Sequence, residues 1–215
     1  MFYRFARWLF SLVFRYLCHW TVEGKENLPT QGPVIIVANH VSNWDPIVVG
    51  VALDRQVHFM AKEELFRVPV FRWILVALGA FSVDRSRGDL GAIKTALRLL
   101  LQGKVVGMFP EGKRNRSQDL LLPFQSGVAL LALKTKAPVI PVGINGSRRI
   151  FYRGWFRPFT VRIGPPVKLP DIVGRKPSAG ELATAVQYME QAVSSLIGLK
   201  PSEKSANVGT FSDSK

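Results

Sequence analysis

The sequence predicts an α/β fold in which a mixed, largely parallel sheet is flanked by helices. Short β-branched runs bounded by turn residues, such as residues 33–38 (PVIIVA), alternate with longer segments of helical periodicity, such as residues 89–101. This alternation is typical of strand–helix–strand units. The 215 residues, of which 47% are hydrophobic and 20% are charged, suffice for one globular domain with its own core.

We expect this domain to occupy residues 21–199, after an N-terminal helix over residues 1–20 and before a polar, disordered tail over residues 200–215. Asp45 followed by Pro46 indicates a helix start with Asp45 as the N-cap. The predicted strands comprise residues 33–38, 57–61, 80–83, 105–109, 138–144 and 159–163. The predicted helices comprise residues 45–53, 70–78, 89–101, 125–136 and 181–197.

The N-terminal segment has the pattern of an amphipathic helix that associates with a membrane surface. Arg4, Arg7 and Arg15 lie on one stripe of the helix, and the remaining circumference is rich in aromatic and aliphatic side chains. A helix that packs on its own domain, or a dimer contact, would show the same pattern. No apolar stretch reaches the length of a bilayer span, and no small-residue cleavage site follows Arg15, which argues against a signal peptide.

The charge of the chain points to anionic partners. Lys and Arg number 29 against 15 Asp and Glu, and many of the basic residues cluster between positions 148 and 176. A net charge of +14 attracts nucleic acid, anionic bilayers or phosphorylated metabolites without choosing among them. Cys18 is the single cysteine, which excludes an intrachain disulfide. The three histidines lack metal-ligand spacing, so we expect no metal site.

The first candidate site is the segment 39–45 (NHVSNWD), between a predicted strand and the next helix. Catalytic groups of open α/β sheets gather at such carboxyl ends of strands. On this turn His40 can meet Asp45, which would hold the imidazole in one tautomer and leave its other nitrogen to act as a base. From these residues alone, a helix cap at Asp45 and a turn residue at His40 explain the segment equally well.

The second candidate site is the segment 109–117 (FPEGKRNRS), at the end of another predicted strand. Gly112 would let the backbone approach a ligand, and Lys113 and Arg114 can hold phosphate. A solvated basic loop is the alternative. Two further segments are residues 79–85 (GAFSVDR), which end in Arg85, and residues 137–142 (APVIPV), which carry no reactive side chain.

Together these four segments resemble the ordered sequence blocks of the glycerolipid acyltransferase family, and specifically of its 1-acylglycerol-3-phosphate (lysophosphatidate) acyltransferases. NHVSNWD is similar to the family's block N-H-x-S-x-x-D, and FPEGKRNRS is similar to F-P-E-G-T-R-S. GAFSVDR and APVIPV resemble the second and fourth blocks. The resemblance covers roughly residues 20–170, and four blocks in order are far more specific than any one of them.

The resemblance implies a role for each matching residue. His40 would be the general base and Asp45 its orienting partner. Glu111, as an anion, would accept a hydroxyl proton or organise the arginines rather than contact phosphate. Lys113 stands where the family usually has Thr or Ser, which leaves the identity of the acceptor open. The residues implied to hold the phosphate and glycerol of the acceptor are Arg85, Glu111, Gly112, Arg114 and a lysine near the phosphate, Lys62.

The implied reaction moves a fatty acyl group from a thioester to the free hydroxyl of 1-acylglycerol 3-phosphate, giving phosphatidic acid. Acyl-CoA or acyl-carrier protein would be the donor substrate, and no cofactor is expected. Because the thioester is already activated, the hydroxyl can attack it directly; an acyl-enzyme on Ser42 is the alternative.

The resemblance also implies membrane lipids and lysophosphatidate as partners, with a peripheral or monotopic protein whose active site faces the cytoplasm. An acceptor such as glycerol 3-phosphate or another lysolipid is the alternative within the family. A non-enzymatic basic protein that binds membranes or nucleic acid is the alternative outside it, although the sequence has no evident nucleic-acid-binding module and we expect no nucleic acid.

Overall fold

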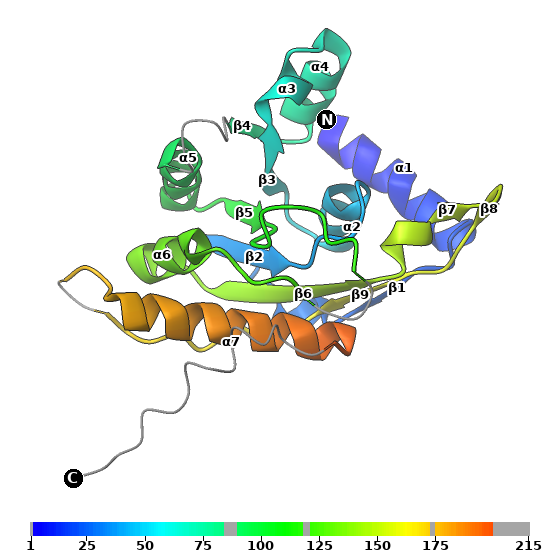
Figure 1. Ribbon diagram of the computed structural model, residues 1–215. Coiled ribbons are helices and arrows are strands. Elements are labelled where there is room, and N and C mark those ends of the chain that lie inside the picture. The colour runs from blue at the N-terminus through cyan, green and yellow to red at the C-terminus, as the bar shows by residue number, and fades with distance from the viewer. Residues whose placement is uncertain (1, 84–89, 118–120, 173–174, 200–215) are drawn as a thin grey trace.

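The computed structural model describes residues 2–83, 90–117, 121–172 and 175–199 of the chain (Figure 1). Its main sheet consists of β1 (Thr21–Glu23), β2 (Val34–Ala38), β3 (Val57–Lys62), β4 (Phe81–Val83), β5 (Val105–Met108), β6 (Val139–Asn145) and β9 (Thr160–Ile163). Their order across the sheet is β1-β9-β6-β2-β5-β3-β4. Neighbouring strands are parallel except β6 and β9, which are antiparallel. The predicted mixed, largely parallel sheet is therefore confirmed.

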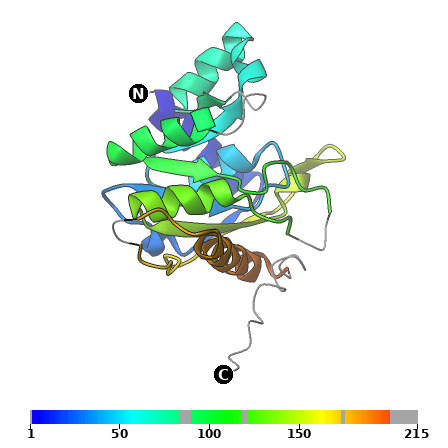
Figure 2. The ribbon, with the colours of Figure 1, turned by 60° about the vertical axis from the view of Figure 1, so that its left-hand side comes forward.

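Helices cover both faces of this sheet, as Figures 1 and 2 show. The helices α1 (Phe2–Tyr16) and α2 (Asp45–Ala52) pack on one face. The helices on the opposite face are α5 (Leu90–Leu101), α6 (Ser126–Thr135) and α7 (Ala179–Ile197). The short helices α3 (Glu63–Phe66) and α4 (Pro69–Ala77) project beyond the end of β3 (Figure 1).

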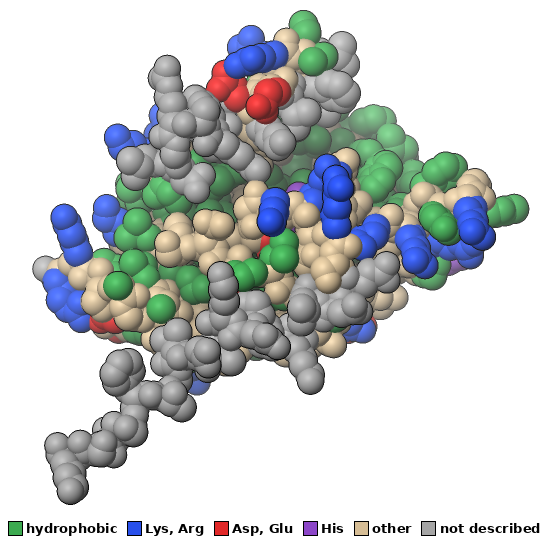
Figure 3. All heavy atoms as spheres, in the orientation of Figure 1, with side chains coloured by type: hydrophobic (Ala, Val, Ile, Leu, Met, Phe, Trp, Pro, Cys, Tyr) green, Lys and Arg blue, Asp and Glu red, His purple; other side chains and the backbone are tan. Residues whose placement is uncertain are grey.

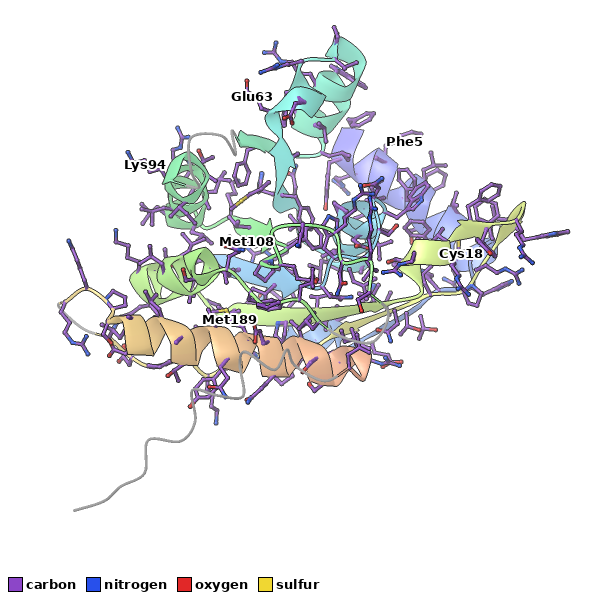
Figure 4. All side chains as sticks on the ribbon, in the orientation of Figure 1. Phe5, Cys18, Glu63, Lys94, Met108 and Met189 are labelled. Atoms are coloured by element: carbon purple, nitrogen blue, oxygen red, sulfur yellow. The ribbon has the colours of Figure 1, made fainter. Side chains whose placement is uncertain are left out.

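The central strand β2 shows why the fold needs helices on both sides. Side chains alternate between the two faces of a strand, and all five residues of β2 are buried. Val34, Ile36 and Ala38 belong to the core under α1 and α2, whereas Ile35 and Val37 belong to the core under α5, α6 and α7. Met189 of α7 points towards the sheet in this second core (Figure 4).

The predicted strands and helices of the domain all form, with ends within about two residues of those expected from periodicity. Elements too short to show a period were missed. These are β1, α3, the 3₁₀ turns η1 (Lys25–Asn27) and η3 (Ser147–Arg149), and the separate hairpin of β7 (Phe151–Tyr152) and β8 (Trp155–Phe156). Residues 200–215, the predicted tail, lie outside the described residues.

The prediction that Asp45 is the N-cap of α2 is wrong. Asp45 is the first residue of the helix, and Trp44, at the cap position, has helical φ and ψ angles with no side-chain cap. The Asp45 carboxylate turns backwards and accepts hydrogen bonds from the N–H groups of Val41 and Ser42, each at 2.7 Å. It therefore stabilises the turn before the helix rather than the first turn of the helix.

The N-terminal helix α1 packs against the domain along one side and exposes the other. Ala6 and Phe14 are buried, Arg7 pairs with Asp54, and the Tyr3 hydroxyl donates to the Gly50 carbonyl at 3.0 Å. Phe5 points away from the domain (Figure 4), as do other large apolar side chains of the exposed side. The predicted helix over 1–20 thus ends at Tyr16, and part of it belongs to the core. No helix among the described residues is both long and apolar enough to cross a bilayer.

Substitution of Phe14 by Ala tests whether α1 is an integral part of the core. The Phe14 ring lies 5.1 Å from the ring of Phe159 and 5.4 Å from that of Trp20. We expect Phe14→Ala to lower the free energy of unfolding by about 3–5 kcal/mol in urea titrations, because it leaves a cavity between α1 and the sheet. The control Phe5→Ala removes a ring that is 58% exposed and should change stability by less than about 0.5 kcal/mol. Equal effects of the two substitutions would contradict this role of α1.

Candidate active site

The candidate site lies where the adjacent parallel strands β2 and β5 end. Their pairing sets Val37 opposite Met108, so the segments that follow the two strands start at the same edge of the sheet. The N–H of His40 donates to Oε1 of Glu111 at 2.6 Å, and the N–H of Asn115 donates to the carbonyl of His40 at 2.6 Å. The two candidate segments predicted from the sequence therefore form one site.

His40 and Asp45 form a hydrogen-bonded pair. Nδ1 of His40 lies 2.9 Å from Oδ2 of Asp45, whose side chain is fully buried. A carboxylate at this distance can accept a hydrogen bond from Nδ1–H, and in that tautomer Nε2 is the nitrogen that can act as a base. The His40 ring stacks on Phe109 with a centroid distance of 4.3 Å, which holds the plane of the imidazole. Geometrically, this arrangement could serve as a base with its orienting group.

Ser147 is a member of the site that sequence reasoning missed. Its hydroxyl, fully buried in η3 after β6, donates to Oδ1 of Asp45 at 2.6 Å. Ser147 and Asp45 are 102 positions apart in the sequence, so no local pattern could reveal the contact. Asn39 is a second residue whose long-range contact was missed. Its side-chain amide accepts a hydrogen bond from the N–H of Ile144 at 2.8 Å and donates one to the Ile144 carbonyl at 2.9 Å, which connects the end of β2 to β6.

Glu111 supports the site through the main chain of His40. Its carboxyl group is buried and accepts hydrogen bonds from the N–H groups of His40 and Leu122. Burial raises the pKa of Glu111 to about 7, although these backbone hydrogen bonds lower it. Glu111 therefore holds the main chain of His40, while Asp45 holds the ring.

The basic residues that follow Glu111 lie on an exposed loop. Gly112 has a φ of 70°, a left-handed conformation that favours glycine, and the side chains of Lys113 and Arg114 are exposed. Arg148 holds this loop by donating to the carbonyls of Asn115, Arg116 and Ser117 at 2.7–3.0 Å. The loop thus presents cations beside the His40 turn and can receive an anionic group.

The remaining predicted residues are placed only in part. Lys62 is the last residue of β3, which pairs with β5, so its backbone lies at the same edge of the sheet. The structure does not describe the Lys62 side chain, and Arg85 lies outside the described residues. Strand β6, which contains most of the APVIPV segment, is buried beside β2. Among the described residues, no group of three or more His, Cys, Asp and Glu side chains is placed to hold a metal ion.

Comparison with known proteins identifies the family. A protein-family model described as Acyltransferase matches residues 19–145, which include both candidate segments. The chain belongs to the acyltransferase family. This confirms the resemblance drawn from the sequence blocks.

Relatives within the acyltransferase family share most of the domain. The chain is 35% identical to the 1-acyl-sn-glycerol-3-phosphate acyltransferase of Bacillus subtilis, over 81% of this chain and 86% of that protein. It is 32% identical to the enzyme of the same name from Borreliella burgdorferi, over 61% of this chain and 53% of that protein. The crystal structure of the 1-acyl-sn-glycerophosphate (LPA) acyltransferase PlsC from Thermotoga maritima superposes with a TM-score of 0.70 and 30% identity, covering 89% of this chain and 76% of that one.

Substitution of Ser147 by Ala tests its part in holding Asp45. It leaves a buried carboxylate oxygen without its donor, so we expect a loss of about 1–3 kcal/mol in the free energy of unfolding. Ser194→Ala is the matched control, because Ser194 is also buried but donates only within its own helix, to the Gln191 carbonyl. Urea titrations should show a clearly larger loss for Ser147→Ala, and equal losses would contradict the role of Ser147.

The raised pKa of Glu111 predicts a pH-dependent stability. The folded pKa of about 7 lies above the ordinary value of 4.5, so the folded protein binds more protons than the unfolded one between these values. The contribution of Glu111 is complete below pH 4.5 and is lost as the pH rises through about 7. Relative to Glu111→Gln, wild type should lose on the order of 3 kcal/mol of stability between about pH 4.5 and 8. Urea titrations that show a constant difference over this range would contradict the raised pKa.

Proposed function

We propose that this chain is a membrane-surface acyltransferase that moves a fatty acyl group from an acyl thioester to 1-acylglycerol 3-phosphate, giving phosphatidic acid. Its relatives carry the names of 1-acyl-sn-glycerol-3-phosphate acyltransferases. The observation that carries the proposal is the His40–Asp45 pair, because it supplies an oriented imidazole beside the exposed cationic loop of Lys113 and Arg114.

His40 acts as the general base in this mechanism. Nε2 takes the proton of the acceptor hydroxyl while the hydroxyl oxygen attacks the thioester carbonyl. The tetrahedral oxyanion then collapses, the carbon–sulfur bond breaks, and the imidazolium returns the proton to the departing thiolate. Asp45 stabilises the imidazolium between these two steps. A positioned base of this kind contributes on the order of 10²–10⁴-fold to the rate.

The surroundings of Ser42 favour direct attack over an acyl-enzyme. Its side chain is buried, and its hydroxyl accepts a hydrogen bond from the N–H of Trp44 at 3.2 Å. Its own N–H donates to Asp45. Ser42 therefore closes the turn that brings His40 to Asp45, and the acceptor hydroxyl is the nucleophile in our proposal.

The cationic loop receives the phosphate of the acceptor. Lys113 and Arg114 are exposed next to the His40 turn, and Gly112 lets the backbone approach the ligand there. Arg85 and Lys62 join this phosphate site in the proposal. Glu111, whose carboxyl group is engaged with backbone N–H groups, fixes the position of the loop that carries His40.

The exposed side of α1 supports a location on the membrane surface. It carries large apolar side chains. This apolar surface extends to α4, because the ring of Phe2 lies 4.7 Å from the ring of Trp73, which is also exposed. An amphipathic surface of this kind is suited to the boundary between headgroups and acyl chains, where the lysolipid acceptor resides. A site on the cytoplasmic side, and acyl-CoA or acyl-carrier protein as donor, complete the proposal.

Acyl transfer by wild type and His40→Ala tests the proposed function. Labelled acyl-CoA and acyl-carrier protein are each offered with lysophosphatidate, glycerol 3-phosphate and a lysolipid without a phosphomonoester. We expect phosphatidic acid from lysophosphatidate, and a loss of about 10²–10⁴-fold in kcat for His40→Ala.

His19→Asn is the matched control for this experiment. His19 is exposed and has a φ of 45°, a conformation that asparagine tolerates. This variant should transfer acyl groups at the wild-type rate. Unchanged turnover in His40→Ala would contradict the role of His40, and preference for another acceptor would contradict the proposed substrate.

A further inference from the structure

The hairpin of β7 and β8 is the part of the protein that the proposed mechanism leaves unused. It forms its own two-stranded sheet, apart from the main sheet. Its turn residues Arg153 and Gly154 have φ angles of 52° and 81°, as in a two-residue turn that closes a tight hairpin. We call residues 151–156 the aromatic hairpin, because four of these six residues are aromatic.

Both faces of the aromatic hairpin carry exposed aromatic side chains. Phe151 pairs with Phe156 on one face and Tyr152 with Trp155 on the other. The four side chains are 59%, 40%, 41% and 72% exposed, respectively. A surface hairpin ordinarily packs one face on the core, and a hairpin this short is marginally stable by itself in water. Four exposed aromatic rings on so small an element indicate that something other than this domain covers them.

The charges around the aromatic hairpin indicate that it binds an anionic surface. The guanidinium groups of Arg149 and Arg153 each lie 5.4 Å from the centre of the Tyr152 ring, and Arg157 follows directly after the hairpin. Residues 148–158 contain no Asp or Glu. Figure 3 shows hydrophobic and basic side chains intermixed over this end of the molecule. Aromatic rings interleaved with arginines are typical of elements that lie at the interface of an anionic bilayer.

The aromatic hairpin follows directly in the chain after residues that contact the His40–Asp45 pair and the cationic loop. Ser147, which donates to Asp45, lies in the turn η3 immediately before it, and Arg148 holds the cationic loop. On its other side the chain continues to Phe159, whose ring contacts Phe14 in α1 and Trp20 beyond the end of α1. A lipid contact at the hairpin would therefore lie next to both the active site and the membrane-facing helix.

We propose that the aromatic hairpin is a second membrane contact, which inserts its rings among the headgroups of an anionic bilayer and turns the catalytic edge of the sheet towards the lipid. This inference rests on the proposed function, since a lipid acceptor is what requires the site to face the bilayer. A second copy of the chain is a less suitable partner for this surface, because two hairpins rich in arginine would repel each other. An acidic carrier protein would match the arginines alone, whereas a bilayer interface matches both the arginines and the exposed rings.

Vesicle partitioning of the full chain tests this inference. Co-sedimentation is measured with vesicles of phosphatidylglycerol and phosphatidylcholine, and with vesicles of phosphatidylcholine alone. Trp155→Ala should lower the partition coefficient on the mixed vesicles roughly tenfold, because it removes the most exposed ring of the hairpin. Arg153→Asn keeps the left-handed turn and removes one charge, so it should lower binding roughly fivefold on the anionic vesicles only.

Tyr188→Ala is the matched control, since it removes a ring that is 43% exposed on α7, away from the hairpin. It should bind vesicles as wild type does, and circular dichroism should show all three variants folded. Wild-type partitioning of Trp155→Ala would overturn the inference. The inference would also be overturned if wild type is a dimer that Trp155→Ala dissociates. The same holds if Trp155→Ala loses binding to the carrier protein while its binding to vesicles is unchanged. Acyl transfer by wild type on the same vesicles tests the proposed function separately. Absence of acyl transfer would contradict that function, whereas vesicle partitioning alone decides the role of the hairpin.

Discussion

The geometry of the site depends on the buried carboxylate of Asp45. Oδ2 is hydrogen-bonded to the His40 ring and to the N–H groups of Val41 and Ser42, and Oδ1 accepts a hydrogen bond from the Ser147 hydroxyl. A carboxylate buried without such partners would be strongly destabilising. Its four hydrogen bonds therefore draw the end of β2, the start of α2 and the turn after β6 to a single point, and the orientation of the imidazole follows from that convergence.

A second buried carboxyl group, that of Glu111, acts on a different part of the same histidine. It binds the main chain of His40 and, through Leu122, the segment beyond the cationic loop. The parallel pairing of β2 with β5 makes this contact possible, because it places residues 71 positions apart at the same edge of the sheet. The ring of His40 and the loop that offers cations are thus positioned by one connected set of hydrogen bonds.

Local patterns in the sequence predicted the sheet, its helices and the contact between His40 and Asp45. The β-branched runs and helical periods decide the class of fold, and the NHVSNWD segment places His40 and Asp45 on one turn. Long-range contacts escaped prediction, because nothing near Ser147 signals its bond to Asp45 and nothing in FPEG signals that the carboxyl group of Glu111 binds main-chain N–H groups. The expected cap at Asp45 was wrong for the same reason: spacing identified a carboxylate at the helix start but not the direction in which it turns.

The basic segment 148–176 shows how charge in a sequence separates into different roles in the fold. Arg148 binds loop carbonyls, Arg162 pairs with Glu23 on the neighbouring strand, and Arg175 pairs with Glu181 at the start of α7. The arginines around the aromatic hairpin instead stack on an exposed tyrosine ring. Only a three-dimensional structure distinguishes cations that hold the protein together from those that face a partner.

The most direct test of the central claim is the nitrogen NMR spectrum of the His40 imidazole at neutral pH. If Asp45 orients His40 as the base, the neutral ring carries its proton on Nδ1 and leaves Nε2 unprotonated. The ¹⁵N shifts should then identify the Nδ1–H tautomer in wild type, and Asp45→Asn should lose that preference. A neutral ring protonated on Nε2 in wild type would contradict the account, because the basic nitrogen would then be Nδ1, which faces Asp45 rather than the acceptor hydroxyl.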